Sequence, residues 1–300
     1  MGTPCLRDDG IGPSVVALPP GPWLSVLDFL AERFPRVGRE ILLARLSRGE
    51  IHDAAGRAVS PEARYRPYEK LYYFREVPDE KPLPVEEHIL FQDERLVVVD
   101  KPHFLPMSPG GKHLRETLVV RLRKRLGNAN LAPIHRLDRD TAGVVLFSVQ
   151  PQTRGVYQRL FADRLIKKCY EAVAPVAPSM TFPLVYRSRL ATGKHFLQMV
   201  EGEGSPNSET AVDCLDQRGE WAYYRLQPLT GKKHQLRIHM ASLGLPIRND
   251  RIYPVLAAAD TPDDLNAPLQ LLARSITFHD PLTGSWRRFS SRRSLQWPSL

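Results

Sequence analysis

Residues 133–147 of this 300-residue chain read PIHRLDRDTAGVVLF, a dense polar run that opens directly into an apolar strand. Loops that lead into buried strands are where rigid scaffolds present catalytic groups. The run also fits a plain solvated turn, in which Asp138, Asp140 and Thr141 hydrogen-bond to nearby backbone groups. The motif therefore marks a candidate site. Other motifs in the sequence decide whether it is a catalytic loop or a solvated turn.

The composition is that of an ordinary globular protein. Apolar residues at 42% and charged residues at 25% exclude collagen-like, disordered and disulfide-scaffold classes. No apolar run approaches the ~20 residues that a membrane span needs, and residues 1–22 lack an export-signal pattern. The three cysteines form no CxxC pair. We therefore expect a cytoplasmic protein with reduced thiols.

The charge balance favours a polyanionic partner. Lys and Arg number 42 against 33 Asp and Glu, which gives a net charge of +9. An excess of this kind is typical of proteins that bind nucleic acid, although many basic enzymes bind none.

Proline and glycine clusters divide the chain into four parts. We expect a flexible N-terminal arm at 1–22, a small module at 23–77, a proline-rich extended linker at 78–84 and the main domain at 85–300. Apolar spacing in the module predicts two helices followed by a hairpin at 51–59.

The main domain mixes strands and helices in a strand-rich order. Several predicted strands follow one another without an intervening helix, which favours an α+β domain on a largely antiparallel sheet. The expected helices lie at 116–126, 152–161 and 233–243; the expected strands lie at 89–91, 96–100, 143–149, 167–173, 194–200, 210–216, 221–227, 271–278 and 286–290.

A second polar cluster, LTGKKHQLRIHMA, covers residues 229–241. His234 and Arg237 are three residues apart, so one helix face can point both into a site. His234 and His239 lie about 140° apart on a helix, which argues against a shared zinc ion. The alternative is a basic amphipathic helix that packs its apolar side into the core.

Two further stretches carry weaker signals. In KKCYEAV at 167–173, strand alternation sends Lys168 and Tyr170 to one face, although a lone strand tyrosine is most often a packing residue. The basic run RLRKR at 121–125 is most simply a solvated helix face that suits phosphates.

Taken in order, these motifs resemble the RluA family of RNA pseudouridine synthases. The resemblance rests on HRLDRDTAG at 135–143 followed by VVLF, KCY at 168–170, GKKHQLRIH at 231–239 and GLPI at 244–247. VDKP at 99–102 and DRIY at 250–253 support it. It covers roughly residues 86–290, and the module at 23–77 is more weakly similar to the αL-type RNA-binding domain that precedes some members.

The resemblance implies a pseudouridine synthase-like catalytic domain on a mainly antiparallel mixed sheet. It implies that Asp138 is the nucleophile, that Tyr170 stacks on the target base and is the candidate base for the final proton removal, and that Arg237 pairs with the aspartate. Arg136 corresponds to the residue that enters the space left by the flipped nucleotide. The other expected substrate-binding residues are His135, Thr141, Lys168, His234 and Gln235.

The physical logic agrees with these roles. A uridine in folded RNA must be extruded at a cost of a few kcal/mol, which an arginine wedge and an aromatic platform offset. A carboxylate beside a guanidinium stays ionised, as a nucleophile must. Breaking the C1′–N1 bond, rotating the uracil and rejoining it through C5 needs confinement and oriented charge. We therefore expect no cofactor and no metal.

The sequence departs from the family pattern at three places. Ala142 stands where a serine is common, residues 232–233 are both lysine, and Arg248-Asn249 replace a usual small-residue lead into the DRIY turn. These changes bear on loop conformation and RNA choice, because none touches Asp138, Tyr170 or Arg237.

Two rival functions remain. One is a non-catalytic RNA-binding protein that keeps the fold. The other is a phosphatase, because residues 138–141 match the D-x-D-x-T pattern of haloacid-dehalogenase-type enzymes, although the strand expected before that pattern is absent. For a synthase, we expect structured RNA as the partner, ribosomal RNA ahead of transfer RNA because of the basic module, with no DNA or membrane partner and a monomeric state.

Overall fold

The computed structural model describes residues 10–76, 80–193, 198–258 and 261–297. The chain divides into two compact units. The smaller comprises Met1–Lys81, Pro109–Arg115 and Arg123–Ala129, and the larger comprises Pro82–Ser108, Glu116–Leu122 and Asn130–Leu300. The first boundary falls inside the linker predicted at 78–84, of which residues 78 and 79 lie outside the described residues.

The smaller unit packs two helices against a three-stranded antiparallel sheet of order β1-β3-β2. Its elements are β1 Ser14–Ala17, α1 Val26–Arg33, α2 Arg39–Ser47, β2 Ile51–His52 and β3 Lys70–Tyr73. Ser25 starts α1 by accepting the Asp28 N–H on its hydroxyl. Leu30, Leu46 and Leu71 lie in the core between the helices and the sheet.

One expectation for this unit needs correction. The segment at 14–17, predicted to belong to a flexible arm, forms β1 and pairs with β3, because Val16 and Leu18 bury their side chains in the core. The high proline content of residues 1–22 hid these two apolar residues from the sequence prediction.

The hairpin predicted at 51–59 is present. The Val59 N–H donates to the Ile51 carbonyl, and His52 forms an antiparallel bridge with Ala58. On its other side, β2 pairs with β3.

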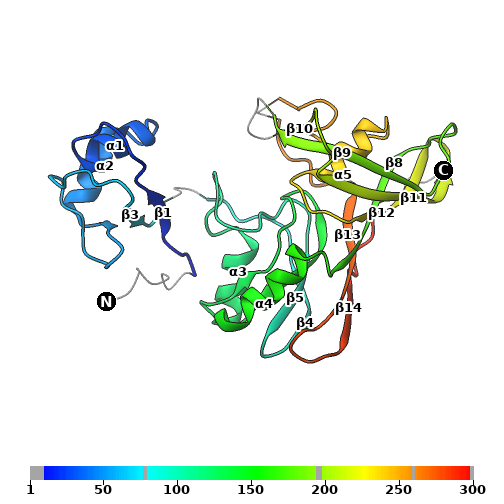
Figure 1. Cartoon of the computed structure of the whole chain (residues 1–300), viewed down its shortest axis with the longest axis horizontal. Coiled ribbons are helices and arrows are strands. Elements are labelled where there is room, and N and C mark those ends of the chain that lie inside the picture. The colour runs from blue at the N-terminus through cyan, green and yellow to red at the C-terminus, as the bar shows by residue number, and fades with distance from the viewer. Residues whose placement is uncertain (1–9, 77–79, 194–197, 259–260, 298–300) are drawn as a thin grey trace. The chain divides into compact units, whose positions relative to one another are not determined.

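The larger unit is built on one extended sheet of order β10-β9-β11-β12-β8-β13-β7-β5-β4 (Figure 1). β14 pairs with β13, and β6 pairs with β7. Every described pairing is antiparallel except the one between β7 and β13. This confirms the predicted α+β fold on a mainly antiparallel mixed sheet. The strands are β4 His88–Gln92, β5 Leu96–Lys101, β6 Ala132–Pro133, β7 Ala142–Ser148, β8 Lys167–Pro175, β9 Leu184–Thr192, β10 Met199–Gly202, β11 Ser208–Arg218, β12 Trp221–Pro228, β13 Leu271–His279 and β14 Trp286–Ser290.

Most predicted elements lie within two residues of their expected bounds. The helices are α3 Leu118–Leu126, α4 Pro151–Ala162 and α5 Gln235–Ser242. The strand predicted at 194–200 is an exception, because β10 begins at Met199 and residues 194–197 lie outside the described residues. The sequence pattern did not predict β9, because its residues are mostly half-buried or exposed and include two arginines.

The parallel contact between β7 and β13 brings the polar loop before β7 onto the middle of the sheet. Gly143 pairs with Ala273 there and has φ +116°. A Cβ at this position would lie 2.2 Å from the Ala273 carbonyl oxygen, so only glycine allows the two strands to approach. The glycine that ends the polar motif is therefore required by packing.

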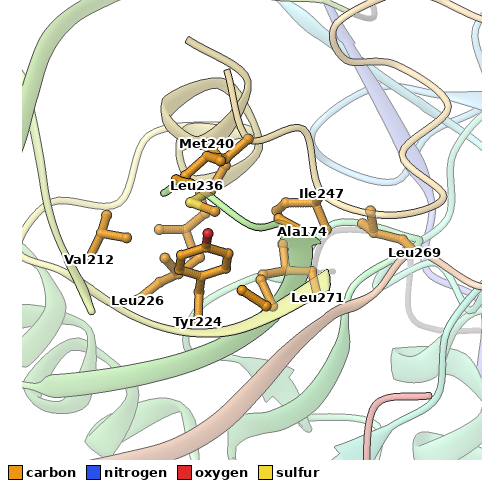
Figure 2. Close-up of a cluster of buried hydrophobic side chains, with 13 residues drawn as sticks. Ala174, Val212, Tyr224, Leu226, Leu236, Met240, Ile247, Leu269 and Leu271 are labelled. Atoms are coloured by element: carbon orange, nitrogen blue, oxygen red, sulfur yellow. The ribbon is translucent and has the colours of Figure 1, made fainter. Parts of the chain in front are cut away.

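Helix α5 is held by an apolar cluster on one face of the sheet. Leu236 and Met240 of α5 are directed toward Tyr224 and Leu226 of β12 (Figure 2). Tyr224 is fully buried, and its hydroxyl donates to the Pro175 carbonyl at 2.7 Å. Removing one such large apolar side chain costs about 2–5 kcal/mol, so the position of α5 is firmly fixed.

Candidate active site

The loop that carries Asp138 is held from beneath by a buried lysine. Lys101, at the end of β5, is fully buried and donates from Nζ to the carbonyls of Pro102, Leu105 and Arg139 at 2.9–3.0 Å. Burial lowers the pKa of its ammonium group to about 7. The loop is also closed internally, because the Thr141 N–H donates to the Asp138 carbonyl at 3.2 Å.

A histidine fixes the next residue of the loop. His103 lies with its Nδ1 2.7 Å from the Asp140 carbonyl oxygen, so Nδ1 carries the proton and donates it. Burial lowers the pKa of His103 to about 4, which keeps the ring neutral. The Asp140 side chain turns to Arg139, at 3.1 Å. Asp140 therefore shapes the loop, as expected of a turn-forming residue.

The side chains of His234, which precedes α5, and Arg237, in its first turn, approach the Asp138 carboxylate, one at each oxygen. His234 Nε2 lies 3.8 Å from Oδ1, and Arg237 Nη1 lies 3.8 Å from Oδ2. His234 precedes α5 in a left-handed conformation, with φ 56°, which is uncommon for a residue with a Cβ. The predicted convergence of these two residues is present, and Asp138 keeps 22% of its side chain exposed to a substrate.

The closest partner of Arg237 is Asp250, for which the sequence predicted no separate role. Its Nε donates to Asp250 Oδ2 at 2.7 Å and its Nη2 to Oδ1 at 2.6 Å, a two-pronged ion pair that is almost completely buried. The N–H groups of Ile252 and Tyr253 also donate to Asp250 Oδ1. The DRIY segment at 250–253 therefore orients the guanidinium that faces Asp138.

Tyr253 orients His234 in the same way. Its hydroxyl lies 2.9 Å from His234 Nδ1 and accepts the Met199 N–H at 2.8 Å. When the hydroxyl donates its proton to Nδ1, the imidazole carries its own proton on Nε2, the nitrogen that faces Asp138. Burial lowers the pKa of His234, so the ring is neutral at pH 7. The hydroxyl also lies 3.3 Å from the Met199 carbonyl oxygen, so when it donates its proton there, the imidazole carries its proton on Nδ1 instead.

Asp138, His234 and Arg237 line a cavity of about 190 Å³, called the catalytic cavity below. Its walls are the loop with Asp138, the β8 residues Lys168 and Tyr170, and residues 230–237. Asp138 is the only carboxylate among the described residues that line it, whereas Arg136, Lys168, Lys232, Lys233 and Arg237 are cationic. The Asp138 carboxylate is thus surrounded by cationic side chains in this cavity.

Tyr170 and Lys168 lie on the face of β8 that borders this cavity, as strand alternation predicts. Burial, with the Asp138 charge as a second cause, raises the pKa of the Tyr170 hydroxyl. The phenol is therefore neutral in the free protein. Lys168 donates to the Thr230 carbonyl at 2.8 Å, and burial lowers its pKa to about 8. Arg136 is exposed at the mouth of the cavity.

Other predicted substrate-binding residues use their polar atoms within the fold. His135 Nε2 accepts the Leu146 N–H, and its ring stacks on Phe161 at 4.5 Å. Gln235 is 4% exposed and donates to Glu209 O and Thr210 Oγ1, while its Oε1 accepts from Thr230. Both residues therefore build the walls of the site.

No group of three or more His, Cys, Asp or Glu side chains within the described ranges could hold a metal ion. The helices that the structure describes include none long and apolar enough to cross a bilayer.

Comparisons with known proteins agree with this geometry. A model of the RNA pseudouridylate synthase family matches residues 95–242. The dual-specificity RNA pseudouridine synthase RluA of Pasteurella multocida is 31% identical over 219 residues, which cover 68% of this chain and 91% of the relative. The chain belongs to the RluA-type family of pseudouridine synthases. It is an RNA pseudouridine synthase, an isomerase, as the motif resemblance implies.

Further relatives support the assignment of this RluA-type protein. An uncharacterized RNA pseudouridine synthase of Synechocystis is 29% identical over 234 residues, which cover 76% of this chain and 79% of the relative. The solved structure of human RNA pseudouridylate synthase domain containing 1 covers 69% of this chain and 84% of its own, with a TM-score of 0.57 and 21% identity. That likeness confirms the fold.

Proposed function

We propose that this protein isomerises specific uridines to pseudouridine in structured RNA, with Asp138 as the nucleophile. The observation that carries the proposal is the position of Asp138. It is the only carboxylate among the described residues lining the catalytic cavity, and Arg237 and His234 face its two oxygens at 3.8 Å. The exposed part of its side chain is available to a bound nucleoside.

The reaction needs no net gain or loss of atoms. Asp138 attacks C1′ as the C1′–N1 bond breaks, and N1 takes the bonding electron pair. The uracil rotates within the cavity, and C5 then attacks C1′. The bond between C1′ and the Asp138 carboxylate breaks in that step and returns its electron pair to the carboxylate. The proton on C5 then leaves and N1 is protonated, so product and substrate are isomers. The Arg237 guanidinium, and His234 when its proton is on Nε2, stabilise and orient the carboxylate.

Access to the uridine requires base extrusion. Arg136 is exposed at the mouth of the cavity, where a guanidinium can occupy the space that the base leaves. Tyr170 offers an aromatic surface for the extruded uracil. Because its phenol is neutral in the free protein, a role for Tyr170 in removing the C5 proton requires that the bound intermediate lower the pKa of the hydroxyl.

Ribosomal RNA is the proposed target, with transfer RNA as the alternative. The proposal rests on the basic module at 23–77, which is similar to an αL-type RNA-binding domain. One relative is named as a dual-specificity enzyme, and another as a transfer RNA pseudouridine(32) synthase, of Saccharomyces cerevisiae. Target choice depends on RNA shape and on surfaces beyond the motifs.

The rival functions make different predictions. A phosphatase would need Asp138 and Asp140 to act together, yet the Asp140 side chain is held by Arg139 outside the catalytic cavity. A non-catalytic RNA-binding protein would show salt-dependent RNA binding and no product.

A pseudouridine map of total cellular RNA decides between these functions. The map is compared between the host with and without the gene, and after complementation with the wild type or Asp138→Asn. We expect one or a few sites to be lost and to be restored only by the wild type. An unchanged map would favour the RNA-binding alternative, and the identity of the lost sites distinguishes ribosomal from transfer RNA.

A further inference from the structure

A second cavity of about 440 Å³ adjoins the catalytic cavity. The two share Arg136, Lys168, Tyr170 and residues 230–232 as lining. The second cavity, called the flanking cavity below, extends to the end of α4 at Phe161 and Arg164 and to Leu229 at the end of β12. A nucleotide whose base enters the catalytic cavity therefore has further room beside it for another part of the same RNA.

The flanking cavity has the charge of a phosphate site. None of its described lining residues is a carboxylate, whereas four are cationic: Arg136, Arg164, Lys168 and Lys232. Among the described residues, the side chains of Arg136, Arg164 and Lys232 have no ion pair, in contrast to Arg139, which pairs with Asp140 and Asp263. Burial and the nearby Arg164 charge both lower the pKa of Lys168. An anion here would offset this crowding of positive charge.

Arg164 occupies a position whose backbone conformation favours glycine. It follows α4 in a left-handed conformation, with φ 59°, and its N–H donates to the Phe161 carbonyl. Glycine is the usual residue at such a helix end, because a side chain there costs about 1 kcal/mol. The chain carries an arginine at this position, with its guanidinium unpaired within the described residues.

Apolar groups complete the wall. Leu229 is 46% exposed, which is high for a leucine that lines a cavity. Phe161 is held in place by stacking on His135, whose Nε2 is in turn fixed by the Leu146 N–H. The wall therefore offers a firm apolar surface beside the cations, the combination that suits a nucleotide.

We propose that the flanking cavity binds a nucleotide next to the target uridine in the RNA chain. Arg164 and Lys232 bind its phosphodiester, and the base lies against Leu229 and Phe161. This inference rests on the proposed function, and it adds Arg164, Lys232 and Leu229 as residues that set affinity for the RNA around the target.

The test compares Arg164→Gly with Arg159→Ala. Glycine suits the left-handed backbone at 164, so the first variant loses the guanidinium without a cost in folding. Arg159 is an exposed arginine of α4 that lines neither cavity and provides a control with the same change of charge. Total RNA from the host lacking the gene serves as substrate, and the rate of pseudouridine formation at the mapped site is measured against RNA concentration.

We expect Arg164→Gly to raise KM about tenfold with a smaller effect on kcat, and to make KM less dependent on salt, as loss of one phosphate contact requires. Arg164→Lys should recover most of the affinity, and Arg159→Ala should stay within about twofold of the wild type. Equal KM values for Arg164→Gly and Arg159→Ala, or a loss confined to kcat, would overturn the proposal. Inactivity of the wild type itself would instead count against the proposed function.

Discussion

Arg237 binds Asp250 through two hydrogen bonds of 2.6 and 2.7 Å, in a pair that is almost completely buried. This pair, rather than contact with Asp138, is the tightest interaction of the arginine that faces the proposed nucleophile. The guanidinium is thus oriented before any substrate arrives, which is the arrangement that electrostatic preorganisation requires.

Asp250→Asn tests this positioning role. The variant leaves a buried guanidinium without its counter-charge, so we expect a loss of about 3 kcal/mol in the free energy of unfolding. We also expect kcat to fall at least tenfold, with RNA affinity within about twofold. Urea denaturation and steady-state kinetics measure the two effects.

The control is Asp213→Asn, which breaks the partly exposed pair with Arg225 and should cost no more than about 1 kcal/mol. Partial recovery of kcat by Asp250→Glu would separate orientation of Arg237 from a general loss of structure. An Asp250→Asn protein with normal kcat would show that the ion pair serves folding alone.

Tyr170→Phe keeps the aromatic ring that is proposed to stack on the uracil and removes only the hydroxyl. We expect RNA affinity to be retained and product formation to be strongly reduced. Filter binding and single-turnover product analysis on the same RNA give the two quantities. Unchanged turnover would show that the Tyr170 hydroxyl has no catalytic role and that the residue serves packing.

Gly143→Ala tests the parallel contact that positions the Asp138 loop. The new Cβ would lie 2.2 Å from the Ala273 carbonyl oxygen at a φ of +116°, so we expect at least about 2 kcal/mol of destabilisation and a loss of activity.

Gly155→Ala provides the matched control for Gly143→Ala. Gly155 lies inside α4, and an added Cβ there would have no atom of another residue within 4 Å outside the adjoining helix backbone, so this change should stabilise the protein by about 0.5–1 kcal/mol. Equal stability of the two variants would contradict the proposed packing requirement.

A buried histidine predicts a loss of stability in acid. His239 is fully buried among the hydroxyls of Ser208 and Thr210, and burial lowers its pKa to about 4. An unfolded histidine titrates near 6.5. As the pH falls from 6.5 toward 4, the unfolded chain therefore binds a proton that the folded protein does not.

At pH 5 this difference in proton binding costs about 2 kcal/mol of stability relative to pH 7. Replacing His239 with glutamine removes this contribution, so the difference in the free energy of unfolding between pH 7 and pH 5 should shrink by about 2 kcal/mol. Urea denaturation at both pH values checks this. The same pH dependence in wild type and variant would show that His239 does not carry the effect.

Features that depend on the local pattern of apolar and polar residues could be predicted from the sequence. Apolar periodicity located most strands of the larger unit and the helices α3, α4 and α5, and strand alternation placed Lys168 and Tyr170 on one face. His234 and Arg237 both approach Asp138, but His234 precedes α5 in a left-handed conformation, so the spacing on one helix face does not account for its position.

The features that could not be predicted from the sequence depend on contacts between segments that are far apart in the chain. Asp250 becomes important only because the fold places it against Arg237, and Lys101 only because it reaches the carbonyl of Arg139. Gln235 was expected from the motif to bind substrate, yet its amide donates to Glu209 and Thr210 of β11. Strand β1 was not predicted because the surrounding prolines outweighed its one buried apolar residue, Val16, and the buried Leu18 that follows the strand.

The most direct test of the central claim is single-turnover pseudouridine formation by purified wild type, Asp138→Asn and Asp140→Asn on the same RNA. Asp140 is the matched control, because its side chain pairs with Arg139 and lines neither cavity. We predict that Asp138→Asn folds, binds RNA and forms no product, whereas Asp140→Asn retains product formation within a few-fold. Normal turnover by Asp138→Asn would contradict the assignment of Asp138 as the nucleophile.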